Sequence, residues 1–200
     1  MERPEETFLG LIWAGYDSLR REQPHIDTAD LERSITQLLE PRMKDAMTGD
    51  EPFYLQHGPF ERETKAPSPA QPPEYDLAFI LRAEERIMWP LEAKVLETPR
   101  SLAAYVRDVR QEFLTCRYAP FANSGAMIGY LLSGTAENAL QHIVRSLGCA
   151  LEAVPTFEGR PNRVSAHSRT VPPGKAYPNT FRCYHLILEF PGLKRTAAAA

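Results

Sequence analysis

The 200-residue sequence predicts an α/β fold with a central mixed β-sheet flanked by helices and a C-terminal β-hairpin extension. Apolar stripes at helical spacing alternate along the chain with short apolar runs of strand type. Two such runs around a charged break predict a β-hairpin over residues 75–96. The last third holds two strand-like segments around a Pro/Gly-rich loop. This length fits one domain, placed at 1–196, with the alanines of 197–200 as a tail.

Two N-terminal helices are expected within residues 8–47. Residues 8–22 carry apolar side chains at a period near 3.6, typical of an amphipathic helix. The second helix is expected to run to about residue 47. Pro41 is expected to kink or break it, because proline has no N–H to donate. Three polar residues can cap its N-terminus: Asp27, Thr28 and Asp30.

A core meander and a following helix are placed at residues 50–134. The last strand of this region is a continuous apolar run, as expected of a strand covered on both faces. The proline-rich stretch 65–73 is expected to be an extended loop. The expected elements are, in order, a weak strand at 53–56, hairpin arms at 75–81 and 87–96, a helix at about 100–117 and a strand at 126–132.

Residues 135–190 are expected to add a helix and a hairpin beyond this core. Thr135 can cap the helix and Gly148 can end it, because glycine adopts the left-handed conformation common at helix C-termini. The expected elements are a helix at 136–147 and strands at 164–170 and 180–190.

Asp76 and the tripeptide Glu92-Ala93-Lys94 lie in the two arms of the predicted hairpin. Side chains alternate along a strand, so Glu92 and Lys94 share a face while Ala93 points the other way. A turn centred near Glu84 places Asp76 opposite Glu92, and opposed residues share a face. Two carboxylates and an ammonium are therefore expected to meet at an edge of the sheet. Burial of charged groups is costly, so the arrangement favours a functional role.

These residue types suit hydrolysis assisted by a divalent metal ion. Two carboxylates can share Mg²⁺ or Mn²⁺, which prefer oxygen ligands. A bound ion can polarise a phosphoryl oxygen, and a neighbouring lysine can stabilise developing negative charge. The alternative interpretation is an ordinary solvated pair of Glu92 and Lys94, with Asp76 as a turn residue.

On these residues the sequence resembles the PD-(D/E)xK nuclease superfamily, which has the restriction-endonuclease-like fold. Tyr75 stands where the family motif has its proline. The resemblance covers about residues 28–134, which follow the family order of helix, three-stranded meander, second helix and further strand. It implies that Asp76 and Glu92 are metal ligands and that Lys94 is the catalytic lysine.

Glu32 is a further candidate, because many members of the superfamily place an acidic residue on the helix before the meander. It borders the apolar stripe that includes Leu31 and Ile35. The alternative is a solvated glutamate whose charge favours the helix N-terminus.

Three arginines are candidate contacts to nucleic-acid phosphates. Arg107 and Arg110 lie on the less apolar side of their predicted helix, and Arg117 precedes the buried strand. The alternative for the first two is a solvated helix face that also carries Asp108 and Glu112.

His167 and His185 lie on the two expected C-terminal strands. Either can be a metal ligand or can make a structural hydrogen bond. The structural role is the commoner one.

Composition limits the possible partners. The net charge of −3 and a pI near 6.0 argue against strong non-specific DNA binding by this chain alone. A partner subunit or a homo-oligomer is therefore expected to contribute contacts to the DNA. Three widely spaced cysteines support neither a zinc site nor a disulfide framework, which favours a reducing cytoplasm. No apolar run approaches the length of a membrane helix.

The expected function is that of a Mg²⁺-dependent endonuclease acting on DNA, as a component of a bacterial defence system against phage or foreign DNA. The bacterial setting rests on analogy with the superfamily. Alternatives are a DNA-repair nuclease, an RNA substrate, a non-catalytic subunit that keeps the fold for assembly or nucleic-acid docking, and an unrelated α/β binding protein.

Overall fold

The computed structural model describes residues 4–63, 72–97 and 99–194, which form a seven-stranded mixed sheet and four α-helices. The helices are α1 (Pro4–Glu22), α2 (Leu31–Asp45), α3 (Pro99–Asp108) and α4 (Ala136–Leu147). The strands are β1 (Phe53–His57), β2 (Leu77–Leu81), β3 (Met88–Leu96), β4 (Ser124–Leu131), β5 (Glu152–Ala153), β6 (Asn162–Ser168) and β7 (Thr180–Glu189). The predicted α/β class is therefore confirmed.

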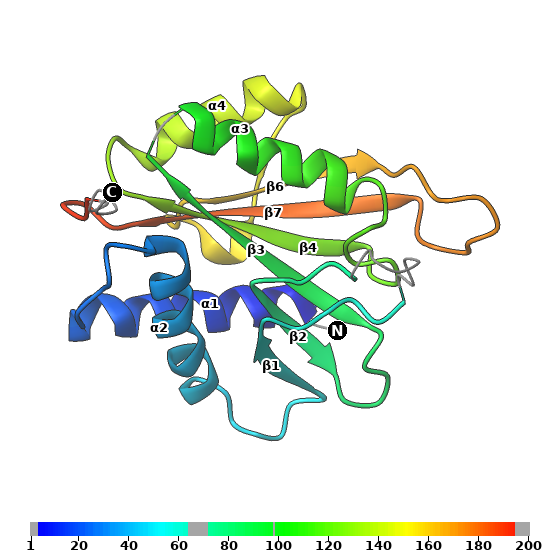
Figure 1. Cartoon of the computed structure of the whole chain (residues 1–200), viewed down its shortest axis with the longest axis horizontal. Helices are drawn as coiled ribbons and strands as arrows, with labels where there is room; N and C mark the ends of the chain where they lie inside the picture. Colours follow the sequence, from blue (N-terminus) through cyan, green and yellow to red (C-terminus); the bar gives the residue numbers. More distant parts are fainter. Residues whose placement is uncertain (1–3, 64–71, 98, 195–200) are drawn as a thin grey trace.

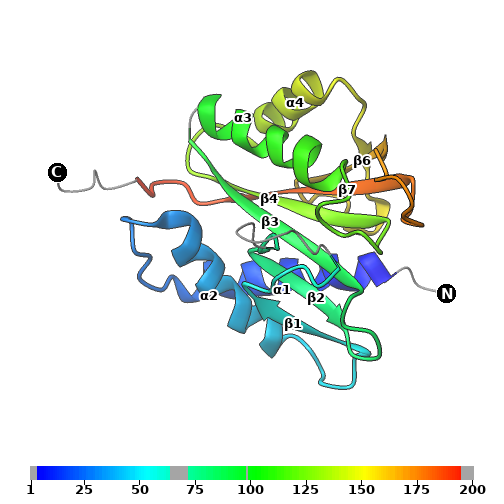
Figure 2. The same ribbon diagram turned by 45° about the vertical axis from the view of Figure 1, so that its right-hand side comes forward.

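The strand order is β1-β2-β3-β4-β7-β6-β5. The first three strands form an antiparallel meander, and β3, β4 and β7 run parallel in the middle of the sheet. Strands β6 and β5 continue it in antiparallel fashion. Helices α1 and α2 cover one face and α3 and α4 the other, as both views show (Figures 1 and 2).

Two apolar clusters fill the space on either side of the sheet. One lies beneath α1 and α2 and includes Ile12, Leu39 and Trp89. The other lies beneath α3 and α4 and includes Tyr105 and Ile143. None of the helices that the structure describes is long and apolar enough to cross a membrane.

Helix α2 begins as predicted, with Asp30 as its N-cap. It is not broken at Pro41, which lies inside a continuous helix. The carbonyl that loses its donor there belongs to Gln37, which is exposed, so water can satisfy it. Leu39 and Met43 are fully buried on either side of the proline and hold the helix on the core.

The helix expected over about 100–117 is shorter and changes its type. Helix α3 ends at Asp108, and residues Val109–Phe113 form a π-helical segment. Val109 and Phe113 are both fully buried, so the apolar stripe of the prediction is retained across the wider turns. The proline-rich loop expected at 65–73 lies largely outside the described residues.

The two C-terminal strands pair as the predicted hairpin, but they belong to the central sheet, so their placement as an extension is wrong. Strand β7 lies in the middle of the sheet, parallel to β4, and β6 pairs with it. The run Leu186-Ile187-Leu188 is buried on both faces, which is the pattern of an internal strand. By contrast, α4 matches its prediction, with Thr135 as N-cap and Gly148 in the left-handed conformation at the C-cap.

Gly129 of β4 is required by close packing next to Lys94 of β3, its register partner. A Cβ at this position would lie 2.5 Å from Leu96 Cδ1 and 3.0 Å from Ile187 Cδ1. Both of these side chains belong to the buried core and cannot move aside without disturbing it.

We therefore expect Gly129→Ala to reduce the free energy of unfolding by about 1–3 kcal/mol through overpacking. Gly10→Ala in α1 is the matched control, because its Cβ would meet Phe157 at an ordinary 3.9 Å. That substitution should leave stability unchanged or raise it by about 0.5–1 kcal/mol. Urea unfolding of both variants measures the difference, and equal midpoints would contradict the packing argument.

Candidate active site

The hairpin register places Asp76 and Glu92 as predicted. Leu77 of β2 pairs with Leu91 of β3, and the same antiparallel register continued by one residue sets Asp76 against Glu92. The site is not at an edge of the sheet, because β3 lies between β2 and β4. It lies next to Leu77, the first residue of β2, where β3 continues without a β2 partner.

Beyond Leu91, β3 has no β2 partner for its backbone, and two carboxylates take that place. Asp76 Oδ2 accepts a hydrogen bond from Ala93 N–H (2.7 Å), and Glu32 Oε2 accepts one from Val95 N–H (3.1 Å). Glu32 comes from the first turn of α2. The unpaired backbone of β3 therefore holds two of the predicted site residues, Asp76 and Glu32, in place.

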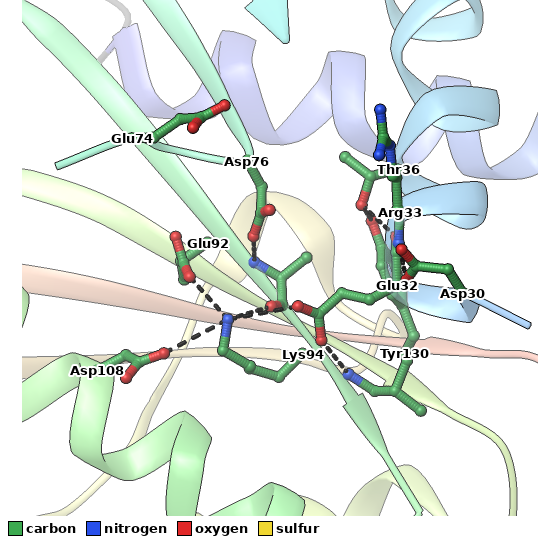
Figure 3. A network of polar contacts seen from close by, with 12 residues as sticks. Asp30, Glu32, Arg33, Thr36, Glu74, Asp76, Glu92, Lys94, Asp108 and Tyr130 are labelled. Carbon is green, nitrogen blue, oxygen red and sulfur yellow. Dashed lines mark hydrogen bonds and ion pairs between the residues drawn. The ribbon is translucent and has the colours of Figure 1, made fainter. Parts of the chain in front are cut away.

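The Lys94 ammonium lies at the centre of this cluster (Figure 3). Its Nζ is 2.7 Å from Glu92 Oε1, 3.4 Å from Asp108 Oδ2 and 3.6 Å from Glu32 Oε1. It also donates to the Ala93 carbonyl (2.8 Å). The cluster thus contains more carboxylates than cationic groups.

Glu92 is the least satisfied member. The residue is 8% exposed, and its second oxygen, Oε2, is buried without a hydrogen-bond partner among the described residues. Burial, followed by repulsion from Asp76, raises the pKa of Glu92 to about 8. An orphaned carboxylate oxygen of this kind is a ready ligand for a cation.

The neighbouring groups respond to the same environment. Burial raises the pKa of Asp76 and of Glu32 above their ordinary values, although each is partly compensated by Lys94 and by the backbone N–H that it accepts. For Lys94, burial acts to lower the pKa, but attraction to Glu92 and Glu32 outweighs it, so the pKa is raised. Lys94 is therefore a permanent cation in this cluster.

The cluster offers two carboxylates, those of Asp76 and Glu92, as ligands for a hard divalent ion. Across the part of the chain that the structure describes, no three His, Cys, Asp or Glu side chains group as ligands of one ion. Asp76 and Glu92 remain as a pair, and Mg²⁺ is commonly held by one or two carboxylates with water completing the shell. The pair therefore fits Mg²⁺ or Mn²⁺ that keeps several waters.

Asp108 is a site residue that sequence reasoning missed. Its side chain is buried and contacts Lys94, whereas the sequence offers Asp108 only as part of the solvated helix face that is the alternative for Arg107 and Arg110. Its position could have indicated burial, because Asp108 lies three residues after Tyr105 and directly before Val109, and both of these residues belong to the buried stripe.

Within the described residues, none of the three predicted phosphate contacts forms a hydrogen bond or ion pair with Lys94, Asp76 or Glu92, although Arg107 borders the cluster through Asp108. Arg107 pairs with Asp108 at 3.1 Å, and Arg117 pairs with Glu112 at 2.7 Å. Arg110 donates to the Ser146 carbonyl (2.7 Å) near the C-terminus of α4, where a cation is favoured by the helix dipole.

The two histidines also lie apart from the cluster, in a hydrogen-bonded chain on β6 and β7. His185 is fully buried between Tyr105 Oη (2.9 Å from Nδ1) and Ser165 Oγ (2.8 Å from Nε2). His167 Nε2 is 2.6 Å from the same Ser165 hydroxyl. Burial lowers the pKa of His185 to about 3, so it is neutral at physiological pH.

A cleft of about 440 Å³ opens beside the cluster, on the side of α2 and β1. Glu32 and Asp76 form part of its wall. Solvent and solutes can therefore approach two of the cluster carboxylates from this direction.

Comparison with protein-family models, curated proteins and solved structures gives no match for this chain.

The raised pKa of Glu92 predicts a pH-dependent stability. The folded protein holds this proton up to about pH 8, while an unfolded glutamate releases it near pH 4.5. The free energy of unfolding therefore falls as the pH rises between these two values. Glu92→Gln imitates the protonated carboxyl. It should match the wild type near pH 5 and melt higher near pH 8.5, by about 2–4 °C per kcal/mol gained. A lower melting temperature of Glu92→Gln at the alkaline pH would show that the carboxylate is net stabilising.

Proposed function

We propose that this protein is a metal-dependent phosphodiester hydrolase of the PD-(D/E)xK type that acts on DNA. The observation that carries the proposal is the buried Glu92 carboxylate, which faces Asp76 across the hairpin, beside the Lys94 ammonium. One of its oxygens has no hydrogen-bond partner in the described part of the chain. A cluster with surplus buried carboxylates is costly for a fold unless a cation neutralises it. Hydrolysis of phosphodiesters uses both parts, a divalent ion and a neighbouring cation.

Each residue has a distinct part in this proposal. Asp76 and Glu92 hold the divalent ion, which when bound polarises a phosphoryl oxygen and supports attack by water. Lys94 stabilises the negative charge that develops on the phosphoryl group. Glu32 and Asp108 keep the lysine charged and in position through their ion pairs with its Nζ.

The chain topology supports the same class. Helix α2, the antiparallel β1-β2-β3 meander, helix α3 and the parallel strand β4 follow one another in the order expected for the restriction-endonuclease-like core. Asp76 directly precedes the second meander strand, and Glu92 and Lys94 lie on the third, in the order of the motif. The additional strands β7, β6 and β5 enlarge the sheet beyond β4.

The biological setting follows from charge and from the superfamily. The net charge of −3 opposes the binding of a polyanion, so we propose that a partner subunit or a second copy provides the main DNA contacts. A role in bacterial defence against phage or foreign DNA is the setting we propose. Arg107 and Arg117, whose side chains are 57% and 52% exposed, are proposed as outer phosphate contacts.

Metal binding and cleavage should separate by residue. Asp76→Asn keeps an oxygen that can accept the Ala93 N–H but loses the charge, so we expect the fold to remain while Mn²⁺ binding and DNA cleavage are lost together. Lys94→Ala should retain most Mn²⁺ affinity while cleavage falls by a factor on the order of 10²–10³. Calorimetric titration with Mn²⁺ and a plasmid-nicking assay measure the two properties.

Lys44→Ala is the matched control, because Lys44 forms a surface ion pair with Glu40 on α2. It should leave both properties unchanged. Full cleavage by Lys94→Ala would remove the lysine from the mechanism. Mn²⁺ binding without cleavage of DNA or of a structured RNA by the wild type would favour the non-catalytic subunit instead.

A further inference from the structure

The cleft beside the candidate active site contains two basic side chains that have no part in the carboxylate cluster. Arg33 of α2 and His57 of β1 line it together with Glu32 and Asp76. Its volume of about 440 Å³ lies within the range of small-ligand sites. The cleft thus combines candidate catalytic carboxylates with groups that can bind an anion.

Arg33 is free to bind such an anion. It is exposed, and its side chain makes no hydrogen bond or ion pair with the described residues. Its backbone N–H donates to Asp30 Oδ1 at 3.4 Å. In Figure 3 its side chain extends away from the Lys94 ammonium. Arg107, Arg110 and Arg117 differ, because each is held by a carboxylate or by carbonyl groups.

His57 is fixed beside Asp76 by the backbone. It pairs with Leu77 at the end of the β1-β2 ladder, and Gly58 N–H donates to the Asp76 carbonyl at 3.1 Å. Opposed residues share a face, so His57 points to the side of the sheet on which Leu77 packs in the cluster beneath α1 and α2. Arg33 and His57 therefore approach the cleft from the same side.

Four acidic side chains also line the cleft. The carboxyl groups lining it are those of Asp30, Glu32, Glu74 and Asp76. A phosphate would be repelled by these groups unless a divalent ion neutralised Asp76 and its neighbours. Arg33 and His57 mark the part of the wall where a second phosphate, next to the one being cleaved, can lie without such an ion.

We propose that Arg33 and His57 bind the backbone phosphate next to the scissile one, so that the DNA strand enters along the α2/β1 side of the sheet. The inference rests on the proposed nuclease function and adds the path of the substrate. A guanidinium binds a phosphate through two parallel N–H···O bonds, which fixes the strand as well as attracting it. Lys94 then meets the scissile phosphate from within the sheet, and Arg33 holds its neighbour from α2.

The test uses binding of a fluorescent DNA duplex to the full chain at low ionic strength, with Ca²⁺ present so that binding is measured without relying on cleavage. Arg33→Gln and the double variant with His57→Asn should weaken binding by about tenfold or more. Arg33→Gln should also reduce the slope of log affinity against log salt by about 0.9, the value for one phosphate contact. Arg33→Lys should keep that slope, because it keeps the charge.

Arg145→Gln is the matched control, since Arg145 is exposed in the last turn of α4 on the opposite face of the sheet. It should change neither affinity nor slope. Mn²⁺ affinity should be the same in Arg33→Gln as in the wild type, because Arg33 does not contact the carboxylate pair. Unchanged DNA affinity and slope in the double variant would overturn the proposed path, while wild-type cleavage would still support the nuclease function. Loss of binding in the variants without wild-type cleavage would support the path and contradict the function.

Discussion

The architecture of the site depends on one mismatch in length: β3 continues beyond the point where β2 pairs with it. The backbone N–H groups of Ala93 and Val95 are left without a strand partner, and unpaired donors inside a protein are costly. Asp76 and Glu32 satisfy them with carboxylates rather than with another strand. The missing strand also opens the sheet, so that groups from the α2 face and the α3 face meet around one ammonium, that of Lys94.

This arrangement has an electrostatic consequence. A sheet interior normally excludes charge, yet here several carboxylates converge on a single lysine, and Glu92 keeps one oxygen without a partner among the described residues. Without a further cation, protonation of Glu92 reduces the excess negative charge. Burial and repulsion from Asp76 accordingly raise the pKa of Glu92 to about 8. A divalent ion would relieve the same excess charge while leaving Lys94 free to face a phosphate. The unneutralised negative charge of the buried carboxylates therefore both destabilises the cluster and gives it affinity for a cation.

Parts of this site could be predicted from the sequence because they follow from local rules. The parity of a hairpin centred near Glu84 was enough to set Asp76 against Glu92. The border of an apolar stripe indicated Glu32 only together with the superfamily resemblance. Asp108 was missed because a carboxylate between basic residues on a helix usually faces water, and only the packing of α3 onto the sheet buries it. The position of β7 likewise depends on which strand it pairs with, a tertiary choice that the apolar pattern of a single segment does not specify. The partner of Arg110 lies on α4, more than thirty residues away, and no local pattern could reveal it.

The central claim is that Asp76 and Glu92 form a cation site that Lys94 accompanies. Crystals soaked in Mn²⁺ and measured at a wavelength where manganese scatters anomalously test it most directly. The account predicts an anomalous peak bonded to carboxylate oxygens of both Asp76 and Glu92, with water completing the shell, and no such peak in crystals of Asp76→Asn. Absence of the peak from the wild type, or its appearance at a site that neither carboxylate reaches, would contradict the account.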